Sequence, residues 1–314
     1  MLLLRDMPRL EPNAANAAFR RFFYSKWGIE TCIISARSTH AEYPPFVQRL
    51  SIKAAWGGAE RYHVDGRSLA VDDDSYLVLN DARCYASTID SPEPVHSFSI
   101  FFRPGMPEKV FGALAASPER LLEHAAEPPR CEVEFAEMLR PHDRVVSPLL
   151  AHICHHVELG LEDEAWYEGE LARLLEAMLH GHRGIARSAE RLGFSRAATR
   201  REIFRRVGLA TDYVHTNYAR AITIDDVARA AHLSKYHFIR LFRAVHGVPP
   251  HEYLRGKRVA AARRLLATTR LSAADIARRV GFEHRTTLFR NLARATGQSA
   301  RSLRSYGAAA GAPA

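Results

Sequence analysis

The sequence predicts an α+β protein of two domains, in which a β-rich part with appended helices precedes an all-α part. Short apolar segments separated by turn residues occupy residues 31–102, apolar positions at helical spacing follow residue 147, and a helix-turn-helix pattern repeats near the C-terminus. A chain of 314 residues is long enough for a core in each part. The expected divisions are residues 1–182, a linker helix region at 183–211, an all-α domain at 212–306 and a disordered tail at 307–314.

Turn signals and alternation indicate the strands of the N-terminal part. Asp65-Gly66 is a strong hairpin signal, and serines alternate with apolar residues along Val95–Phe102. Many short strands at this spacing predict a β-sandwich or a small barrel. A barrel of this size can hold one small ligand in its mouth. Aromatic strand residues are either candidates for that pocket or plain core, with no basis for choosing among Trp56, Tyr62, Tyr76, Tyr85 and Phe98.

An enzymatic metal site in this part would need three or four converging His or Glu ligands. His63 and His96 lie on expected strands, but the sequence has no His-x-His pair followed by Glu. His152, His155 and His156 share an expected helix without a carboxylate at matching spacing. We therefore expect no catalytic residues, no metal and no cofactor, and we leave the ligand-binding residues unassigned.

The cysteines and the hydropathy pattern indicate the compartment. The four cysteines form no CxxC pair, so free thiols in a reducing cytoplasm are the simplest interpretation. The apolar start Met1–Leu4 is too short for a signal peptide, and no stretch approaches the roughly 18 apolar residues of a membrane span. We expect a cytoplasmic protein without a membrane partner.

Charge is unevenly distributed along the chain. Residues 212–306 contain 18 Lys and Arg but only 6 Asp and Glu, a net charge of +12, whereas the whole chain carries +9. The remainder is therefore mildly acidic. A basic C-terminal third beside an acidic remainder is typical of a polyanion-binding module attached to a domain that does not bind polyanions.

The segment Ile224–Gly247 has the pattern of a helix, a tight turn and a second helix. Ser234 is expected to begin the second helix, with its hydroxyl accepting a backbone N–H. The second helix has apolar residues at i, i+3, i+4 and i+7, namely Phe238, Leu241, Phe242 and Val245. Its opposite face is basic and aromatic, which suits insertion into a DNA major groove.

A second copy of this pattern follows. Asp275-Ile276-Ala277 repeats Asp226-Val227-Ala228 at an offset of 49, whereas Arg290 repeats Arg240 at an offset of 50. One residue is therefore gained at the second turn, around residues 281–284, while the helices keep their register. Chance explains two copies much less easily than one, so the sequence predicts a double helix-turn-helix.

A joining helix is expected from Pro250 to near Thr268. Its roughly 18 residues would span about 27 Å, which suits two reading helices in successive major grooves, ~34 Å apart. Tyr236 and Arg240 lie four residues apart on an exposed face, and Thr286 and Arg290 repeat that placement. Arginine bound to guanine is the commonest specific contact. The expected DNA-binding residues are Lys235, Tyr236, Ile239, Arg240, Arg285, Thr286, Phe289 and Arg290.

The last third of the chain resembles the AraC/XylS family of bacterial transcription regulators. The resemblance rests on the blocks Ile224–Arg264 and Ser272–Arg304, including Pro249-Pro250 and Val280-Gly281-Phe282. It implies base readout at the positions named above and a role as an activator that contacts RNA polymerase. It also implies that the N-terminal part is a cupin-like β-barrel with appended helices, serving as an effector or dimerisation domain. Phe289 departs from the family, which more often has a small or polar residue there.

The sequence therefore predicts a transcription regulator that reads two successive major grooves and is not an enzyme. Its expected partners are double-stranded promoter or operator DNA, RNA polymerase, a small-molecule effector and a second copy of the chain. Two alternatives stay open. One is a metal-dependent cupin-type enzyme fused to a DNA-binding domain, and the other is a non-specific architectural DNA binder.

Overall fold

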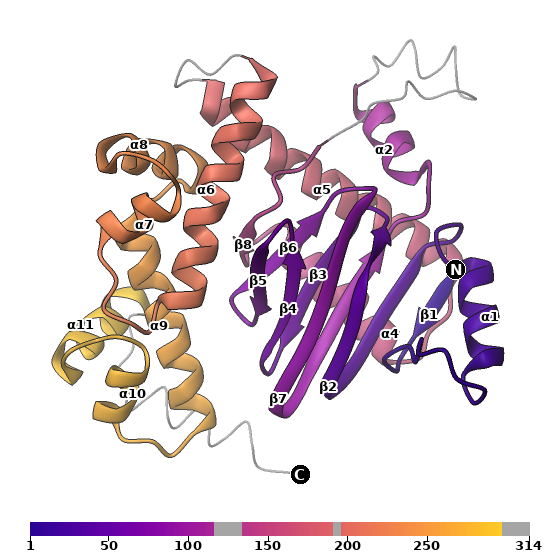
Figure 1. Ribbon diagram of the computed structural model, residues 1–314, viewed down its shortest axis with the longest axis horizontal. Coiled ribbons are helices and arrows are strands. Elements are labelled where there is room, and N and C mark those ends of the chain that lie inside the picture. Colours follow the sequence, from indigo (N-terminus) through magenta and orange to yellow (C-terminus); the bar gives the residue numbers. More distant parts are fainter. Residues whose placement is uncertain (116–133, 191–195, 297–314) are drawn as a thin grey trace. The chain divides into compact units, whose positions relative to one another are not determined.

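The computed structural model describes residues 1–115, 134–190 and 196–296. These form two compact units, which span Met1–Glu190 and Arg191–Ala314 (Figure 1). The first combines a β-sheet with helices, and the described part of the second is helical. The predicted α+β organisation in two parts is therefore confirmed. The tail predicted at residues 307–314 lies outside the described residues.

The first unit is built on an eight-stranded sheet. Its strands are β1 (Leu2–Leu4), β2 (Cys32–Gln48), β3 (Ser51–Trp56), β4 (Ala59–Val64), β5 (Arg67–Asp72), β6 (Ser75–Leu79), β7 (Arg83–Phe101) and β8 (Leu139–Pro141). Its helices are α1 (Ala17–Lys26), α2 (Met106–Ala115), α4 (Val146–Glu158) and α5 (Glu164–Glu190). The strand order is β1-β2-β7-β3-β6-β8, and β4 pairs with β5 and β7. Between the described strands no pairing joins β8 to β1, so the sheet is open where the sequence suggested a closed barrel.

The long strands β2 and β7 run through both halves of this sheet. They pair antiparallel from Cys32 opposite Phe101 to Gln48 opposite Arg83. Register shifts interrupt the pairing at two places along β2, and such irregularities bend and twist strands. β3 pairs with the C-terminal half of β7, whereas β4 pairs with its N-terminal half. The bend therefore places β3 and β4 in different halves of the sheet.

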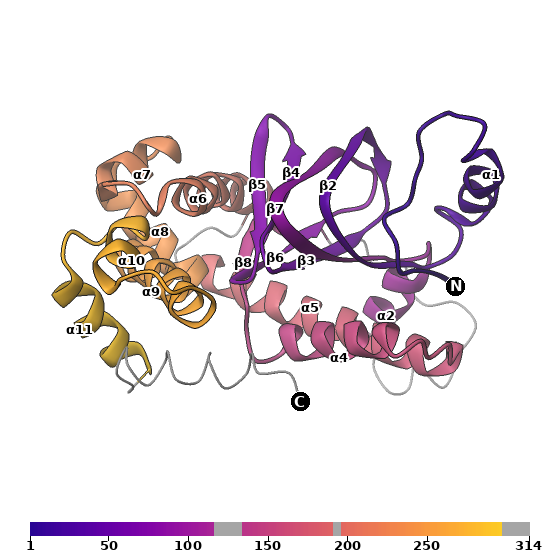
Figure 2. The ribbon, with the colours of Figure 1, turned by 90° about the horizontal axis from the view of Figure 1, so that it is seen from below.

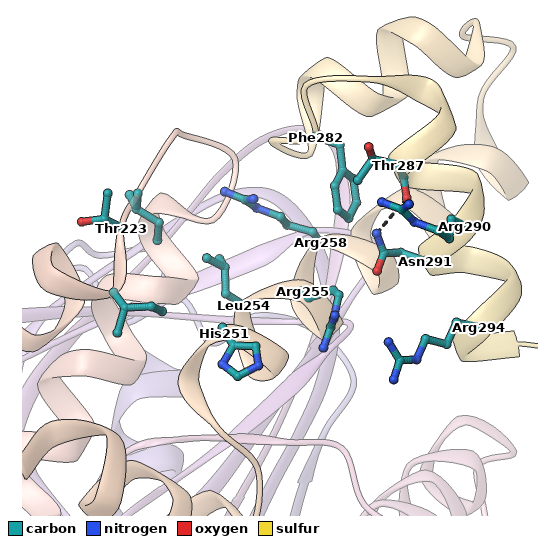
Figure 3. Close-up of a pocket in the computed structure, with 12 residues that line it drawn as sticks. Thr223, His251, Leu254, Arg255, Arg258, Phe282, Thr287, Arg290, Asn291 and Arg294 are labelled. Carbon is teal, nitrogen blue, oxygen red and sulfur yellow. Dashed lines mark hydrogen bonds between the residues drawn. The ribbon is translucent and has the colours of Figure 1, made fainter. Parts of the chain in front are cut away.

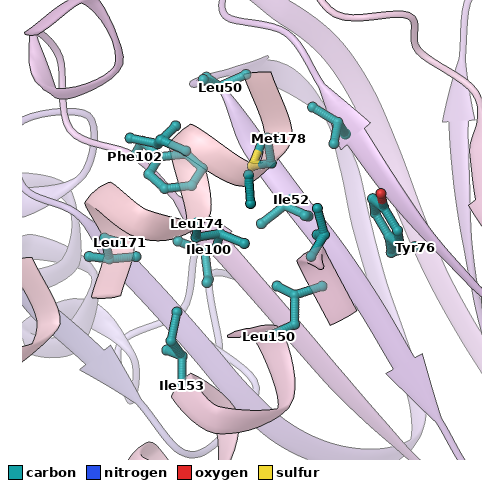
Figure 4. Packing of buried hydrophobic residues seen from close by; sticks show 14 of the residues in the cluster. Leu50, Ile52, Tyr76, Ile100, Phe102, Leu150, Ile153, Leu171, Leu174 and Met178 are labelled. Atoms are coloured by element: carbon teal, nitrogen blue, oxygen red, sulfur yellow. The ribbon is translucent and has the colours of Figure 1, made fainter. Parts of the chain in front are cut away.

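Helices α4 and α5 lie along one face of the sheet (Figure 2). Figure 4 shows the core between them, in which Ile52 and Ile100 of the strands meet Leu150 of α4 and Leu174 of α5. All four side chains are fully buried, at 0% exposure. Full burial of such a side chain contributes about 1.5–3 kcal/mol, so this layer holds the helices on the sheet.

The second unit contains two helix pairs joined by one long helix. Its helices are α6 (Ala197–Asn217), α7 (Ile224–Ala230), α8 (Lys235–His246), α9 (Pro250–Thr268), α10 (Ala273–Arg279) and α11 (Arg285–Thr296). The predicted double helix-turn-helix is confirmed, and α9 has the bounds expected for the joining helix. Pro250 starts α9 without loss of a hydrogen bond, because the first N–H groups of a helix have no partner within it.

Hydroxyl side chains cap the first helix of each pair. Thr223 accepts a hydrogen bond from the Asp226 N–H, and Ser272 accepts one from the Asp275 N–H. The Asp226 carboxylate in turn accepts from the Thr223 N–H, which completes a capping box and lowers the pKa of Asp226. Ser234 is the N-cap residue of α8, but its side chain makes no capping hydrogen bond. The predicted role of its hydroxyl was therefore wrong.

This difference predicts unequal effects of two matched substitutions. Thr223→Ala should lower the free energy of unfolding by about 1 kcal/mol, because an N–H of α7 loses its acceptor. Ser234→Ala should cost clearly less. Urea denaturation followed by the helical circular dichroism signal would measure both, and an equal loss would contradict the assigned caps.

Gly281 ends α10 where space and backbone conformation both require glycine. Its φ is +84°, and a Cβ there would lie 2.7 Å from the carbonyl oxygen of Tyr218. His232 takes the same place in the first pair, also with a positive φ of 53°. The first turn thus tolerates a side chain that the second cannot accept.

Substitution of Gly281 should therefore cost more than backbone strain alone. Gly247, at the end of α8, has a φ of +76° and open space around its position. Gly247→Ala should cost about 1 kcal/mol, and Gly281→Ala about 2–3 kcal/mol because a collision is added. The thermal unfolding midpoints of the two variants would measure this difference. Equal midpoints would show that the backbone at Tyr218 moves aside for the added Cβ without cost.

Candidate nucleic-acid interface

The two turns share one set of backbone hydrogen bonds. The Leu233 N–H donates to the Ala228 carbonyl at 3.0 Å, and the Phe282 N–H donates to the Ala277 carbonyl at 2.9 Å. These bonds repeat at an offset of 49. α8 and α11 begin at Lys235 and Arg285, an offset of 50. The predicted gain of one residue within the second turn is therefore confirmed.

Aromatic packing fixes the rotation of α8. Phe238 and Phe242 are fully buried and meet edge to face, with ring centroids 5.3 Å apart. Phe242 makes a second such contact at 5.3 Å with Tyr253 of α9. The Tyr253 hydroxyl lies 2.9 Å from the His215 Nε2 of α6. Helix α9, itself held by α6 through Tyr253, thus packs on the buried side of α8, which leaves the opposite side exposed.

An aliphatic cluster does the same for α11. Leu288 and Leu292 are both fully buried. They pack in one cluster with Ile276 of α10 and with Val259 and Leu266 of α9. The C-terminal half of α9 therefore serves the second pair, whereas Tyr253 near its start serves the first.

All eight residues predicted to contact DNA are exposed on α8 or α11. Tyr236 is 81% exposed, the highest value among the exposed large hydrophobic residues. Ile239 and Phe289, which correspond at an offset of 50, are each 36% exposed. Arg240 and Arg290 lie near them on the same exposed faces. The structure thus presents two faces of matching composition, one on each helix.

Lys235 differs from the other predicted contacts. Its ammonium lies 2.8 Å from the Asp225 carboxylate at the start of α7. Both side chains are more than half exposed, at 56% and 55%. An exposed pair of this kind contributes about 0–1 kcal/mol, so it can open when a phosphate approaches.

A cleft between the helix pairs brings the predicted contact Arg290 together with His251 and Arg255, which the sequence analysis did not predict (Figure 3). It has a volume of about 640 Å³ and is lined by parts of α9 and α11 and by the segment before α7. Five basic residues line it, namely His251, Arg255, Arg258, Arg290 and Arg294, and its described lining includes no carboxylate. The i, i+4 spacing of His251 and Arg255 is a sequence signal that could have indicated this basic face of α9.

Arg258 has a structural role in this cleft. Its guanidinium donates to the backbone carbonyls of Tyr218 and Arg220 at 2.7 and 2.8 Å. Burial lowers the pKa of Arg258. This side chain is thereby committed to holding the segment before α7, whereas Arg294 lies exposed at the cleft.

The N-terminal histidines do not gather into a metal site within the described ranges. No group of three or more His, Cys, Asp or Glu side chains there is arranged to hold a metal ion. His96 instead lies 2.9 Å from the Ser35 hydroxyl, and burial lowers its pKa. Cys32, Cys84 and Cys154 are free thiols. No helix in the described ranges is long and apolar enough to cross a membrane.

Comparisons with known proteins agree with this geometry in the C-terminal unit. Residues 227–306 match the family described as "Helix-turn-helix domain". The lactose operon transcription activator of Staphylococcus xylosus is 38% identical over 74 residues, which cover 24% of this chain and 26% of that protein. The HTH-type transcriptional activator AarP of Providencia stuartii is 34% identical over 71 residues, which cover 23% of this chain and 53% of AarP.

A solved structure is also similar to part of this chain. The DNA-binding domain of AdpA, described as a global transcriptional factor and crystallised with a target DNA, is 27% identical, with a TM-score of 0.32. The match covers 33% of this chain and 95% of the AdpA domain. This chain spans only about a quarter to a half of the two curated relatives named above, at 26% and 53%. The C-terminal part of the chain therefore carries a helix-turn-helix domain similar to those of AraC-type transcription regulators.

Proposed function

We propose that the protein is a sequence-specific transcription regulator, acting as an activator, whose α8 and α11 enter two successive major grooves of one DNA duplex. The observation that carries this proposal is the pair of matching exposed faces joined by one continuous helix. α9 has 19 residues, and at ~1.5 Å each they span roughly 28 Å. That length is close to one turn of DNA.

Base readout is assigned to the residues that repeat between the two faces. Arg240 and Arg290 would each contact a guanine, since arginine matches its two major-groove acceptors. Tyr236 and Thr286 stand one helical turn before them and would contact a neighbouring base. Ile239 and Phe289 would touch thymine methyl groups. Lys235 and Arg285, at the helix starts, would reach a base edge or a phosphate.

The basic cleft is assigned to the DNA backbone between the two grooves. Arg255 and Arg294 would lie along this stretch and neutralise phosphates there. Arg255 pairs only loosely with Glu252, at 3.6 Å, so its guanidinium remains available. Phosphate contacts of this kind position a protein on DNA without reading its sequence.

The N-terminal part is assigned to signal reception. We infer that residues 1–182 form a cupin-like effector and dimerisation domain, that residues 183–211 link it to the DNA reader, and that RNA polymerase is the partner in activation. The support is the similarity of the C-terminal unit to the matching parts of transcription activators, together with a bent sheet that encloses a polar interior. The curated relatives named above are transcription activators by name.

Removal of either guanine-reading arginine should weaken specific binding. Arg240→Ala and Arg290→Ala should each cost ~1–3 kcal/mol on the preferred site and relax the preference at one base position. The preferred site would first be selected from random duplex DNA, and affinities would then be compared at one salt concentration. Arg205→Ala is the matched control, because Arg205 is an exposed arginine of α6 that pairs with Glu202.

The control should change affinity by less than about 0.5 kcal/mol. An equal loss for all three variants would indicate a purely electrostatic contribution. If the selected site bound no better than random DNA, the protein would be a non-specific binder instead.

Bipartite reading also predicts a strict dependence on spacing. Five base pairs inserted between the two halves of the selected site would rotate one half to the opposite side of the duplex. Affinity should fall to that of a single half-site, and a ten-base-pair insertion should not restore it because α9 has a fixed length. Gel-shift titration of the three duplexes would measure this, and undiminished affinity would show that one helix pair suffices.

A further inference from the structure

The N-terminal unit encloses a polar interior that the proposed DNA interface does not use. Ser97 and Ser99 of β7 face away from the helix-covered side of the sheet, yet they are only 2% and 5% exposed. Lys53 of β3 stands opposite Ser99 and is 1% exposed. Glu60 and Tyr62 of β4 cover them from the other half of the sheet, at 3% and 2% exposure. The polar face of these strands thus lines an interior.

A cavity of about 50 Å³ lies in this interior. Lys53, Glu60 and Ser99 form part of its polar wall, and Phe23, Trp27 and Phe101 form part of its apolar wall. One water molecule needs about 10–15 Å³ of cavity volume, so the cavity has room for roughly four groups of the size of a water molecule. Its size therefore suits a ligand of about four to six non-hydrogen atoms that protrudes slightly from the mouth.

The two buried charges in this cavity differ in how they are satisfied. The Glu60 carboxylate accepts a hydrogen bond of 2.6 Å from the Ser97 hydroxyl. The Lys53 ammonium instead sits over aromatic rings, 3.4 Å from the centroid of Phe101 and 5.5 Å from that of Tyr85. Within the part of the chain that the structure describes, it donates no hydrogen bond and has no carboxylate oxygen within 4.0 Å.

A buried ammonium without an acceptor is costly, and the pKa of Lys53 reflects this cost. Burial lowers it to about 7, although the Glu60 carboxylate partly opposes the shift. The Cys32 thiol and the aromatic rings of Tyr62 and Tyr85 also lie near this ammonium. A ligand that supplies an anionic acceptor would hold Lys53 charged and replace the water that it lost.

The remaining walls narrow the class of this ligand. The negative charge of Glu60 disfavours a ligand that carries two negative charges. This excludes dianions such as phosphate monoesters. The aromatic side chains favour an apolar body, which a bare halide ion lacks. A monocarboxylate with a short carbon chain combines these properties.

We propose that this cavity binds a small monocarboxylate, whose carboxylate accepts hydrogen bonds from Lys53 and whose carbon chain lies against Phe23, Trp27 and Phe101. This inference rests on the proposed sensing role of the N-terminal unit and names the chemical class of its effector.

The test compares propionate with propionamide, a neutral ligand of the same shape. Saturation-transfer NMR on the full-length protein, without DNA, should show propionate binding and at least about tenfold weaker binding of propionamide. Lys53→Met, which keeps the side-chain length, should weaken propionate binding by a similar factor. Lys109→Met, an exposed lysine of α2 outside the cavity, is the matched control and should change nothing.

Three results would overturn the proposal. Equal affinity for propionamide would remove the role of charge, and this comparison needs no variant. Unchanged binding to Lys53→Met, with its fold confirmed by circular dichroism, would remove the role of Lys53. Failure of acetate, propionate and lactate alike to bind would remove the ligand class.

DNA affinity of the same preparation separates this inference from the proposed function. If these carboxylates fail to bind while specific DNA binding persists, only the ligand assignment falls. If specific DNA binding is absent while propionate binds through Lys53, the regulator assignment falls and the cavity stands.

Discussion

The packing of α9 against both helix pairs is the constraint on which the C-terminal unit depends. Tyr253 near its start contacts Phe242 of α8, and Leu266 near its end belongs to the cluster of Leu288 on α11. Protein interiors are close-packed, so either pair could rotate about α9 only by opening cavities or forcing overlaps. One helix therefore sets the direction of both exposed faces.

The two turns fix where α8 and α11 begin, and so where their individual side chains lie. Each uses the same backbone hydrogen bonds and a positive φ at its centre, His232 in one and Gly281 in the other. The extra residue of the second turn lies between this shared geometry and the start of α11. The register within α11 is unchanged, so Arg290 keeps the placement of Arg240. The close approach of Gly281 to Tyr218 ties the second turn to the segment that Arg258 also holds.

The N-terminal unit uses the two faces of its strands for different purposes. On β3 and β7, Ile52 and Ile100 pack under the helices, while Lys53 and Ser99 line the enclosed interior. Both faces are buried, but only one is apolar. Burial of the Lys53 ammonium costs free energy, and the aromatic rings around it compensate only part of that cost. A bound anion would compensate the rest. This imbalance distinguishes the cavity from ordinary core.

Local patterns in the sequence determined the helices of the C-terminal unit and their exposed faces. Helix periodicity and the repeat at offsets of 49 and 50 are properties of short segments, and they predicted the bounds of α9 and the exposure of all eight candidate residues. The basic cleft was missed, because His251 and Arg255 lie near Arg294 only after α9 and α11 pack together.

Only the tertiary structure decided the N-terminal interior. Of the five aromatic residues considered for a pocket, Tyr62 and Tyr85 line it, whereas Trp56, Tyr76 and Phe98 pack on the helix side. Alternation shows that serines share a face of β7, but it does not show whether water or another strand lies opposite. The answer depends on how β2 and β7 bend and bring β4 over β3. These are contacts between segments far apart in the chain, and the pattern of one segment does not predict its contacts with the other. The repeat in the sequence therefore determined the double helix-turn-helix. The burial of Lys53 was decided only by pairing between strands far apart in the chain.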